Sequence, residues 1–91
     1  MGIKEETSPT EKLDETTEVV KKLILFNDDF NTFDFIIESL VEVCKHDFIQ
    51  AETCALIAHY KGKCAIKSGS IDKIRPIYVE MTRRRIIVEI N

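Results

Sequence analysis

The feature that most constrains this chain is a stretch where an apolar run, a polar corner and a helical pattern follow one another. Residues 23–26 read Leu-Ile-Leu-Phe, and a short apolar run bounded by turn-forming residues is typical of a buried strand. Residues 27–29 read Asn-Asp-Asp, and such side chains bond to nearby backbone groups and favour turns. Asn31 followed by Asp34 is typical of a helix N-terminus. The stretch therefore predicts a strand, a polar corner at the rim of a core, and a helix capped at Asn31.

Two helices are predicted to follow the first strand, which is expected over residues 19–26. Apolar side chains recur at helical spacing from residue 33 to residue 44 and give the first helix one apolar face. Asp47 with Gln50 predicts the start of a second helix, which Gly62 is expected to end. The expected core positions of that second helix are Phe48, Ala51, Cys54, Ala55, Leu56 and Ala58.

The last third of the chain predicts a strand over residues 63–67, a helix over 71–82 and a strand over 85–90. Pro76 removes a backbone donor inside that third helix, so the helix is expected to begin late or to kink. The element order is β-α-α-β-α-β. It predicts an α+β fold in which a small three-stranded antiparallel sheet packs against three helices.

Charge is distributed unevenly along the chain. Residues 1–18 carry six acidic and two basic side chains, a net charge of −4, whereas residues 19–91 carry a net charge of +1. A segment so poor in apolar residues cannot bury enough surface to offset the entropy of ordering. We therefore expect a disordered extension over 1–18 and one domain over 19–91. The nearly neutral domain does not favour general nucleic-acid binding.

The three cysteines indicate a reducing compartment, because an odd number does not suit an extracellular disulfide framework. No apolar run approaches a membrane span and no signal-peptide pattern is visible, so a soluble, cytoplasmic protein is expected. Cys44, Cys54 and Cys64, with His46 and His59, allow a zinc interpretation, but structural zinc sites use tighter ligand pairs. The Cys-Lys-His sequence also leaves a weak catalytic-thiol interpretation, without an evident third residue.

A second segment, residues 59–63 (His-Tyr-Lys-Gly-Lys), favours a functional interpretation of the polar corner. Together with residues 27–29, the helix beginning at Phe33, and Ala51, it resembles the ClpS family, adaptors that recognise destabilising N-terminal residues for a Clp protease. The resemblance extends over residues 20–91. It implies the same β-α-α-β-α-β arrangement, which the C-terminal domain of the ribosomal stalk protein shares.

The resemblance assigns recognition of a substrate's N-terminal amine to Asn27, Asp28 and His59. A free ammonium has three donors and a positive charge, so converging acceptors, at least one of them anionic, hold it best. An Asn carbonyl, an Asp carboxylate and an imidazole nitrogen meet this need. Asp29 is expected to hold the corner structurally. Taken alone, a histidine near a helix C-terminus is more often a dipole partner or a surface residue.

The resemblance also implies an apolar pocket for the substrate's first side chain. Carried over by position, its wall comprises Asn31, Phe33, Ile36, Ala55, Ala58 and Ile86. Phe33 stands where the family usually has a gating methionine, Ala55 where another methionine is common, and Ala58 where valine is common. The resemblance thus leaves the preferred side chain open. Residues 83–85 (Arg-Arg-Arg) suggest either a solvated turn or a contact to phosphate or an acidic partner.

The expected function is a monomeric, non-enzymatic adaptor. It binds N-termini that begin with Leu, Phe, Tyr or Trp and docks on the N-terminal domain of a Clp AAA+ unfoldase, ClpA- or ClpC-like. The resemblance gives residues 1–18 a part in delivery, and an inert terminus is the alternative. An interaction module of the ribosomal-stalk type, or a small enzyme using Asp28, Asp29 and His59, remain other classes. No cofactor, metal, nucleic acid or membrane partner is expected.

Overall fold

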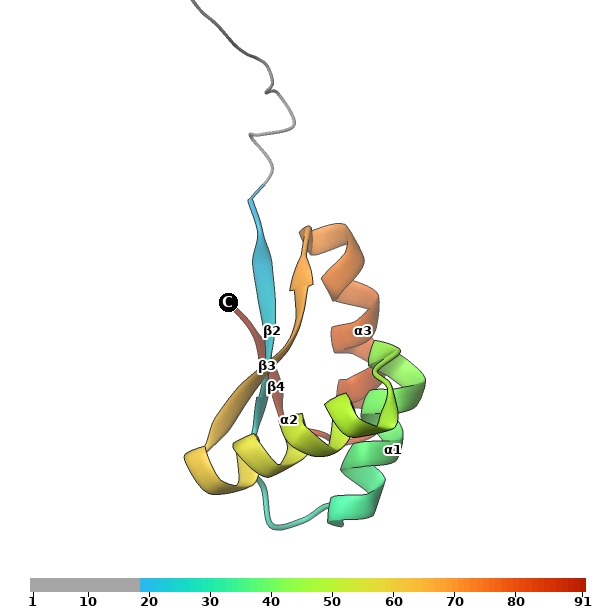
Figure 1. The fold of residues 1–91 in the computed structure, drawn as a ribbon. Coiled ribbons are helices and arrows are strands. Elements are labelled where there is room, and N and C mark those ends of the chain that lie inside the picture. Colours follow the sequence, from blue (N-terminus) through green and yellow to red (C-terminus); the bar gives the residue numbers. More distant parts are fainter. Residues whose placement is uncertain (1–18) are drawn as a thin grey trace, which may run out of the picture.

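The protein has the predicted element order, and the computed structural model describes residues 19–91 (Figure 1). The elements are β2 (Lys21–Phe26), α1 (Phe33–Cys44), α2 (Phe48–Lys61), β3 (Lys63–Gly69), α3 (Ile71–Arg83) and β4 (Val88–Ile90). The prediction of an α+β fold with three helices and a three-stranded antiparallel sheet is confirmed. The extension predicted over 1–18 lies outside the described residues.

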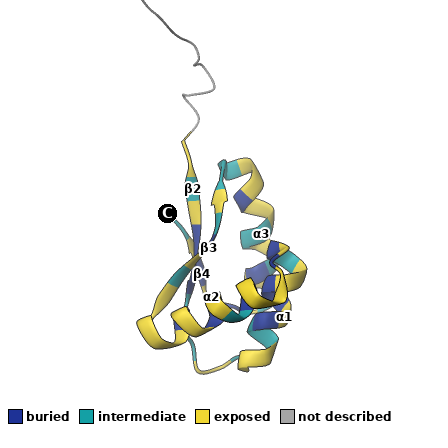
Figure 2. Ribbon diagram, in the orientation of Figure 1, coloured by how far each residue is buried: buried dark blue, intermediate teal, exposed yellow. Residues whose placement is uncertain are grey.

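Strand β2 is the centre of the sheet, whose order is β3-β2-β4. It pairs antiparallel with β3 on one side and with β4 on the other. The three helices lie on one side of this sheet in Figure 1. Leu23 and Leu25 belong to the core. Ile24 between them points to the opposite face of the sheet, as strand geometry requires, but it is also buried, whereas Lys22 is exposed. Figure 2 shows the buried positions gathered where helices and sheet face each other.

The first helix begins one residue later than its predicted cap. Thr32 is the N-cap of α1, and its side-chain oxygen accepts a hydrogen bond of 3.1 Å from the backbone nitrogen of Phe35. The prediction that Asn31 caps the helix was therefore wrong. The reason is tertiary, because the Asn31 side chain is bonded to Asp28 and to a distant carbonyl of Arg85.

Both predicted ends of α2 are confirmed. Asp47 is the N-cap, and its carboxylate accepts a hydrogen bond of 2.8 Å from the backbone nitrogen of Gln50. Gly62 ends the helix with φ of 97°, a left-handed conformation that glycine adopts without a Cβ penalty. Strand β3 starts at the next residue, so the direction of the chain changes within one residue.

The third helix runs unbroken through its proline. α3 begins at Ile71. Of the two expectations for Pro76, the late start was therefore wrong, and the kink stays a prediction. Proline in a helix leaves the carbonyl four residues earlier without a backbone donor. Here that carbonyl belongs to Asp72, and both residues are exposed, so water can supply the missing hydrogen bond. The sequence showed that Pro76 lies within the third helix but not that it faces the solvent.

The final strand is shorter than the predicted 85–90 and covers Val88–Ile90. Arg85 has a positive φ of 64°, which no strand residue adopts. The backbone nitrogen of Ile86 donates to the carbonyl of Met81 at 3.0 Å, so this segment closes the end of α3 before the strand begins. The chain is thereby turned sharply back towards the sheet.

One core joins the sheet to the helices. Its buried residues are Leu23, Leu25, Ile37, Leu40, Cys44, Ala51, Cys54, Ala55, Ala58, Ile66, Ile74, Met81, Ile86 and Val88. Two predicted core positions of α2 were wrong, since Phe48 is 57% exposed and Leu56 is 40% exposed. The buried face of α2 consists of three alanines and one cysteine, a narrow stripe that lets the helix approach its neighbours closely. Among the described residues, no helix is long and apolar enough to span a membrane.

Arginine side chains tie the end of α3 to α1. Arg84 contacts Glu42 at 2.9 Å and donates to the hydroxyl of buried Ser39 at 3.1 Å. Arg83 and Arg84 both pair with Glu80. Hydrogen bonds from Arg83, and then from Arg84, lower the pKa of Glu80 to about 2. Two arginines of the 83–85 cluster are therefore engaged within the fold.

Candidate functional site

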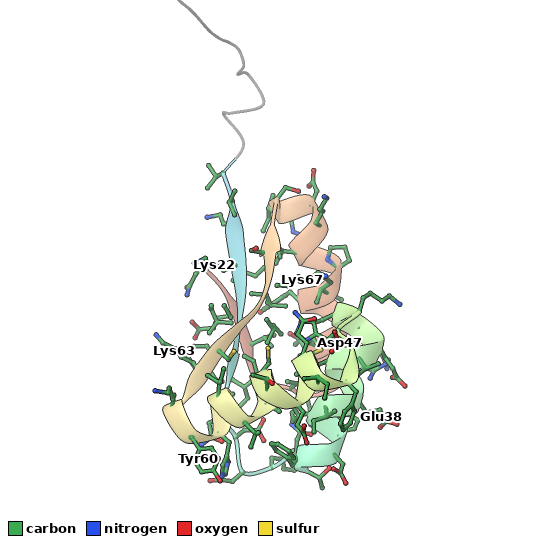
Figure 3. The ribbon with its side chains drawn as sticks, viewed as in Figure 1. Lys22, Glu38, Asp47, Tyr60, Lys63 and Lys67 are labelled. Carbon is green, nitrogen blue, oxygen red and sulfur yellow. The ribbon has the colours of Figure 1, made fainter. Side chains whose placement is uncertain are left out.

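A cavity of about 460 Å³ opens where the polar corner meets the start of α1 and the second half of α2. It is lined by Leu25, Phe26, Asn27, Asp28, Asp29, Asn31, Phe33, Ile36, Ala55, Leu56, Ala58, His59 and Tyr60. Figure 3 labels Tyr60 at this end of α2. The three residues predicted to hold an amine, Asn27, Asp28 and His59, all line this one cavity although they are up to 32 positions apart in the sequence.

A backbone hydrogen bond brings the corner to the end of α2. The nitrogen of Asn27 donates to the carbonyl of Gly62 at 2.9 Å. This bond continues the antiparallel pairing of β2 with β3, in which Phe26 is the partner of Lys63. Because Gly62 ends α2 and β3 follows at once, the last turn of the helix is held beside the corner. His59 lies on that last turn.

The corner itself is built around the carboxylate of Asp28. Its Oδ1 accepts hydrogen bonds from the backbone nitrogens of Phe30 at 2.9 Å and Asn31 at 2.8 Å. Its Oδ2 accepts one bond of 3.2 Å from the Asn31 side chain. The structure thus gives the corner-holding role to Asp28 rather than to Asp29, which is exposed. The physical reason is that an Asx turn uses the carboxylate of its first residue to bond backbone nitrogens two and three positions on.

Asp28 keeps acceptor capacity after these bonds. A carboxylate offers about four lone-pair positions, and the described hydrogen bonds of Asp28 use three of them. Its geometry is fixed by the turn, so a bound donor would meet a carboxylate that is already oriented. This preorganisation removes part of the ordering cost of binding.

The electrostatics of the cavity suit a cation. Its lining contains the two carboxylates of Asp28 and Asp29, and no lysine or arginine is among the lining residues in the described part of the chain. The C-terminal end of α2 also faces it through His59 and Tyr60. The last carbonyls of a helix carry about half a negative charge in total, which adds to the field of the carboxylates.

Five of the six residues predicted for the side-chain pocket line the cavity: Asn31, Phe33, Ile36, Ala55 and Ala58. Ala55 and Ala58 are 4% and 3% exposed, so they form its floor, and Phe33 is 39% exposed at its rim. The floor is built from methyl groups, which leaves the space above it open. An apolar side chain of a ligand would therefore find apolar atoms below it and the polar corner beside it.

Ile86 does not line the cavity. It is 3% exposed and belongs to the core between sheet and helices. The tight turn after α3 explains this position, because Arg85 takes a left-handed conformation and Ile86 then bonds back to Met81. The assignment of Ile86 to the pocket wall depended on the length of this turn, and the spacing of nearby residues does not define that length.

Four lining residues were missed in the sequence: Leu25, Phe26, Leu56 and Tyr60. Leu25 and Phe26 directly precede the corner at the end of β2. Leu56 and Tyr60 are four positions apart on α2 and therefore share a helix face. That spacing was the signal that could have found them. Tyr60 is 77% exposed, and its ring meets the ring of His59 edge-on, with centroids 4.8 Å apart at 78°.

None of the three cysteines is among the residues that line this cavity. Cys44 and Cys54 are buried and Cys64 is half-buried, and all three are free thiols. Burial raises the pKa of Cys44 and of Cys54 to about 11, which disfavours the thiolate that metals and nucleophilic chemistry require. Within residues 19–91, no group of three or more Cys, His, Asp or Glu side chains is arranged to hold a metal ion.

A family model described as "ATP-dependent Clp protease adaptor protein ClpS" matches residues 17–85. The chain belongs to the ClpS family. It is 31% identical over 65 residues to the ClpS of Sodalis glossinidius (strain morsitans) and 29% identical over 65 residues to that of Serratia proteamaculans (strain 568). In both cases the match covers 69% of this chain and 61% of the relative. The chain thus spans less than two thirds of the length of these two ClpS proteins.

Agrobacterium tumefaciens ClpS2, whose structure was determined bound to L-phenylalaninamide, has the same fold. The superposition has a TM-score of 0.75 with 18% sequence identity and covers 79% of this chain and 94% of that one. At this identity the likeness establishes the ClpS architecture alone.

Proposed function

We propose that this chain is an adaptor that binds the free N-terminus of proteins beginning with Leu, Phe, Tyr or Trp and delivers them to a Clp AAA+ unfoldase for degradation. The observation that carries the proposal is the single cavity in which Asn27, Asp28 and His59 meet an apolar floor. An N-terminal residue presents an ammonium and a side chain on one carbon atom, so its binding site needs a polar and an apolar part next to each other.

The polar part holds the ammonium. Asp28 supplies the anionic oxygen, and its two backbone hydrogen bonds fix the direction in which that oxygen points. The Asn27 side-chain carbonyl and an imidazole nitrogen of His59 supply the remaining acceptors. Charge-assisted hydrogen bonds of this kind are about twice as strong as neutral ones. An amide nitrogen from the middle of a chain lacks both the charge and the three donors, so the site selects true N-termini.

The apolar part takes the first side chain. The whole cavity, polar and apolar parts together, has a volume of about 460 Å³, within the range of about 300–1,000 Å³ that is usual for small-ligand sites. The small floor residues Ala55 and Ala58 leave room for a large side chain, and Phe33 at the rim offers an aromatic surface to pack against it. ClpS2 of Agrobacterium tumefaciens was solved with L-phenylalaninamide. That compound combines a free amine with an aromatic side chain, which supports the same ligand class here.

The chain acts without chemistry of its own. Its sequence has no phosphate loop, so in this proposal the Clp partner hydrolyses ATP and cuts the substrate. The partner surface is the N-terminal domain of a ClpA- or ClpC-like unfoldase, and the adaptor works as a cytoplasmic monomer. The family's description as a Clp protease adaptor supports this partner class.

The proposal is tested by fluorescence anisotropy with two peptides that differ only at their N-terminus. A dye-labelled peptide beginning with Phe should bind, and its N-acetylated form should bind about 2–5 kcal/mol more weakly, since a charged hydrogen-bonding partner is lost. Equal affinity for the two peptides would contradict amine recognition. Absence of binding by either peptide would instead favour a plain interaction module.

A matched pair of variants tests whether peptide binding depends on the charge within the proposed site. Asp28→Asn removes one negative charge from the cavity, and Asp34→Asn removes one from an exposed position in the first turn of α1, outside the lining residues. Only Asp28→Asn should weaken binding of the free peptide. Thermal melting of both variants controls for damage to the corner.

A further inference from the structure

A second cavity of about 410 Å³ lies near the other end of β2, away from the proposed amine site. It is lined by Lys22, Cys44, Lys45, His46, Gln50, Ala65, Ile66, Lys67 and Ser68. These residues come from β2, the end of α1, the link to α2, the start of α2, and β3, so only the folded chain brings them together. Figure 3 labels Lys22 and Lys67 on the two strands, and Lys63 further back along β3.

The cavity is strongly positive. Three lysines line it, and no carboxylate is among the lining residues in the described part of the chain. None of the three forms an ion pair with a described carboxylate, since the described pairs all involve Arg83 or Arg84. Like charges held around one cavity repel each other unless a counter-charge is bound.

The end of α1 offsets only part of this charge. Lys67 donates a hydrogen bond of 2.9 Å to the carbonyl of Cys44, the last residue of the helix. The carbonyls of a helix C-terminus amount to about half a negative charge, against three positive charges from the lysines. The charge of Lys67 also acts on the buried thiol of Cys44. Burial raises the pKa of Cys44 to about 11, and the charge of Lys67 acts in the opposite direction.

A buried histidine with an unpaired nitrogen forms one wall. The register of β2 with β3 shifts at Leu23, so Ile66 has no partner on β2 and forms a bulge. His46 is 5% exposed, and its Nε2 lies 2.7 Å from the carbonyl oxygen of Ile66. Because a carbonyl only accepts, Nε2 carries the proton. Nδ1 is buried without a hydrogen-bond partner among residues 19–91, which is uncommon for a buried polar atom.

We propose that this cavity binds a phosphate group, carried by inorganic phosphate or by a phosphorylated small molecule. Lysine is a common phosphate ligand acting as a point charge, and Ser68 and Gln50 add neutral polar groups. His46 lines the cavity as a buried wall beside these polar groups. The cavity is large enough for a phosphate with an attached small group.

The test is a titration of the full chain followed by two-dimensional ¹H–¹⁵N NMR. Inorganic phosphate should produce saturable shifts at the amides of Lys45, His46, Lys67 and Ser68, and sodium chloride at the same ionic strength should not. A parallel titration with glycerol 2-phosphate distinguishes the two sources, because tighter binding of the ester indicates a phosphorylated molecule and tighter binding of the free ion indicates inorganic phosphate. Equal shifts in chloride and phosphate would overturn the proposal.

Three single variants locate the site. Lys45→Gln and Lys67→Gln each remove one charge from the cavity, and Lys63→Gln removes one charge from the same strand outside it. Loss of one charged hydrogen bond of about 1.5–3 kcal/mol corresponds to about tenfold weaker phosphate binding or more. Lys45 is exposed, so its replacement leaves the fold intact and keeps the test valid if Lys67→Gln is unstable. The same affinity in Lys45→Gln and Lys63→Gln would overturn the proposal.

Discussion

The side-chain amide of Asn31 donates a hydrogen bond of 2.9 Å to the main-chain carbonyl of Arg85, which lies 54 residues further along the chain. The same amide donates to the carboxylate of Asp28 at 3.2 Å. One side chain therefore joins the corner that carries the proposed amine site to the turn before β4. The orientation of Asp28 depends in part on a segment that contributes no residue to the cavity lining.

Replacing Asn31 with alanine should loosen this joint. Asn31→Ala removes both hydrogen bonds, so we expect a loss of about 1 kcal/mol in the free energy of unfolding, measured by urea denaturation. Binding of a peptide that begins with Phe should also weaken, because Asp28 loses one of its three donors. Asn91→Ala, at an exposed asparagine, is the matched control and should change neither quantity. Wild-type values for both quantities in Asn31→Ala would show that the joint is unimportant.

Larger side chains at the floor of the cavity test whether this space holds the first side chain of the substrate. Ala55→Met and Ala58→Met each extend a longer side chain into space that a substrate residue is proposed to fill. Binding of a Phe peptide should weaken more than binding of a Leu peptide, by about tenfold, a size typical of small changes in pocket volume. The affinities are measured by anisotropy. An unchanged ranking of Phe and Leu in both variants would place these alanines in the core alone.

The arginine cluster makes stability depend on acid pH through Glu80. Its pKa is lowered from 4.5 to about 2 by hydrogen bonds from Arg83 and Arg84. A lowered carboxyl pKa contributes stability above the unfolded-state value, and that contribution disappears as the pH falls towards the folded-state value. Wild type should therefore be more stable than Glu80→Gln above about pH 4.5, and the two should converge near pH 2, as followed by urea denaturation.

Exposed Glu38 offers the control for this titration. Glu38→Gln removes the same charge from α1 without touching the arginines, so its stability should follow wild type across this pH range. Because the Glu80 pairs are accessible to solvent, added salt should also reduce the difference. A difference between wild type and Glu80→Gln that persisted at pH 2 would contradict this origin.

Residues 1–18 are predicted to matter for delivery rather than for binding. Every residue of the proposed site lies after them in the sequence, so deleting residues 1–18 should leave peptide affinity unchanged. Degradation of a model substrate should slow in an assay reconstituted with the cognate unfoldase and peptidase. A variant in which a Gly/Ser segment of equal length replaces residues 1–18 tests whether delivery depends on the length of the extension or on its sequence. Full-rate degradation by the deleted chain would favour an inert terminus.

Features set by neighbouring residues could be derived from the sequence. The order of elements follows from the change between strand and helix periodicity. The start of α2 at Asp47 and its end at Gly62 follow from capping chemistry that acts within three or four residues. The polar corner was visible for the same reason. The sequence thus determined that an acidic turn follows β2 and that His59 lies on the last turn of a helix.

Contacts between distant segments were decided only by the tertiary structure. The bond from Asn27 to Gly62 brings the corner to the helix end, and the bond from Asn31 to Arg85 takes Asn31 away from capping. The same turn places Ile86 in the core rather than in the cavity wall. Local spacing carries no information about these pairs, because their geometry depends on turn lengths and on how all the elements pack. The residue types of the corner could therefore be derived from the sequence, whereas the shape of the cavity depends on how distant segments pack.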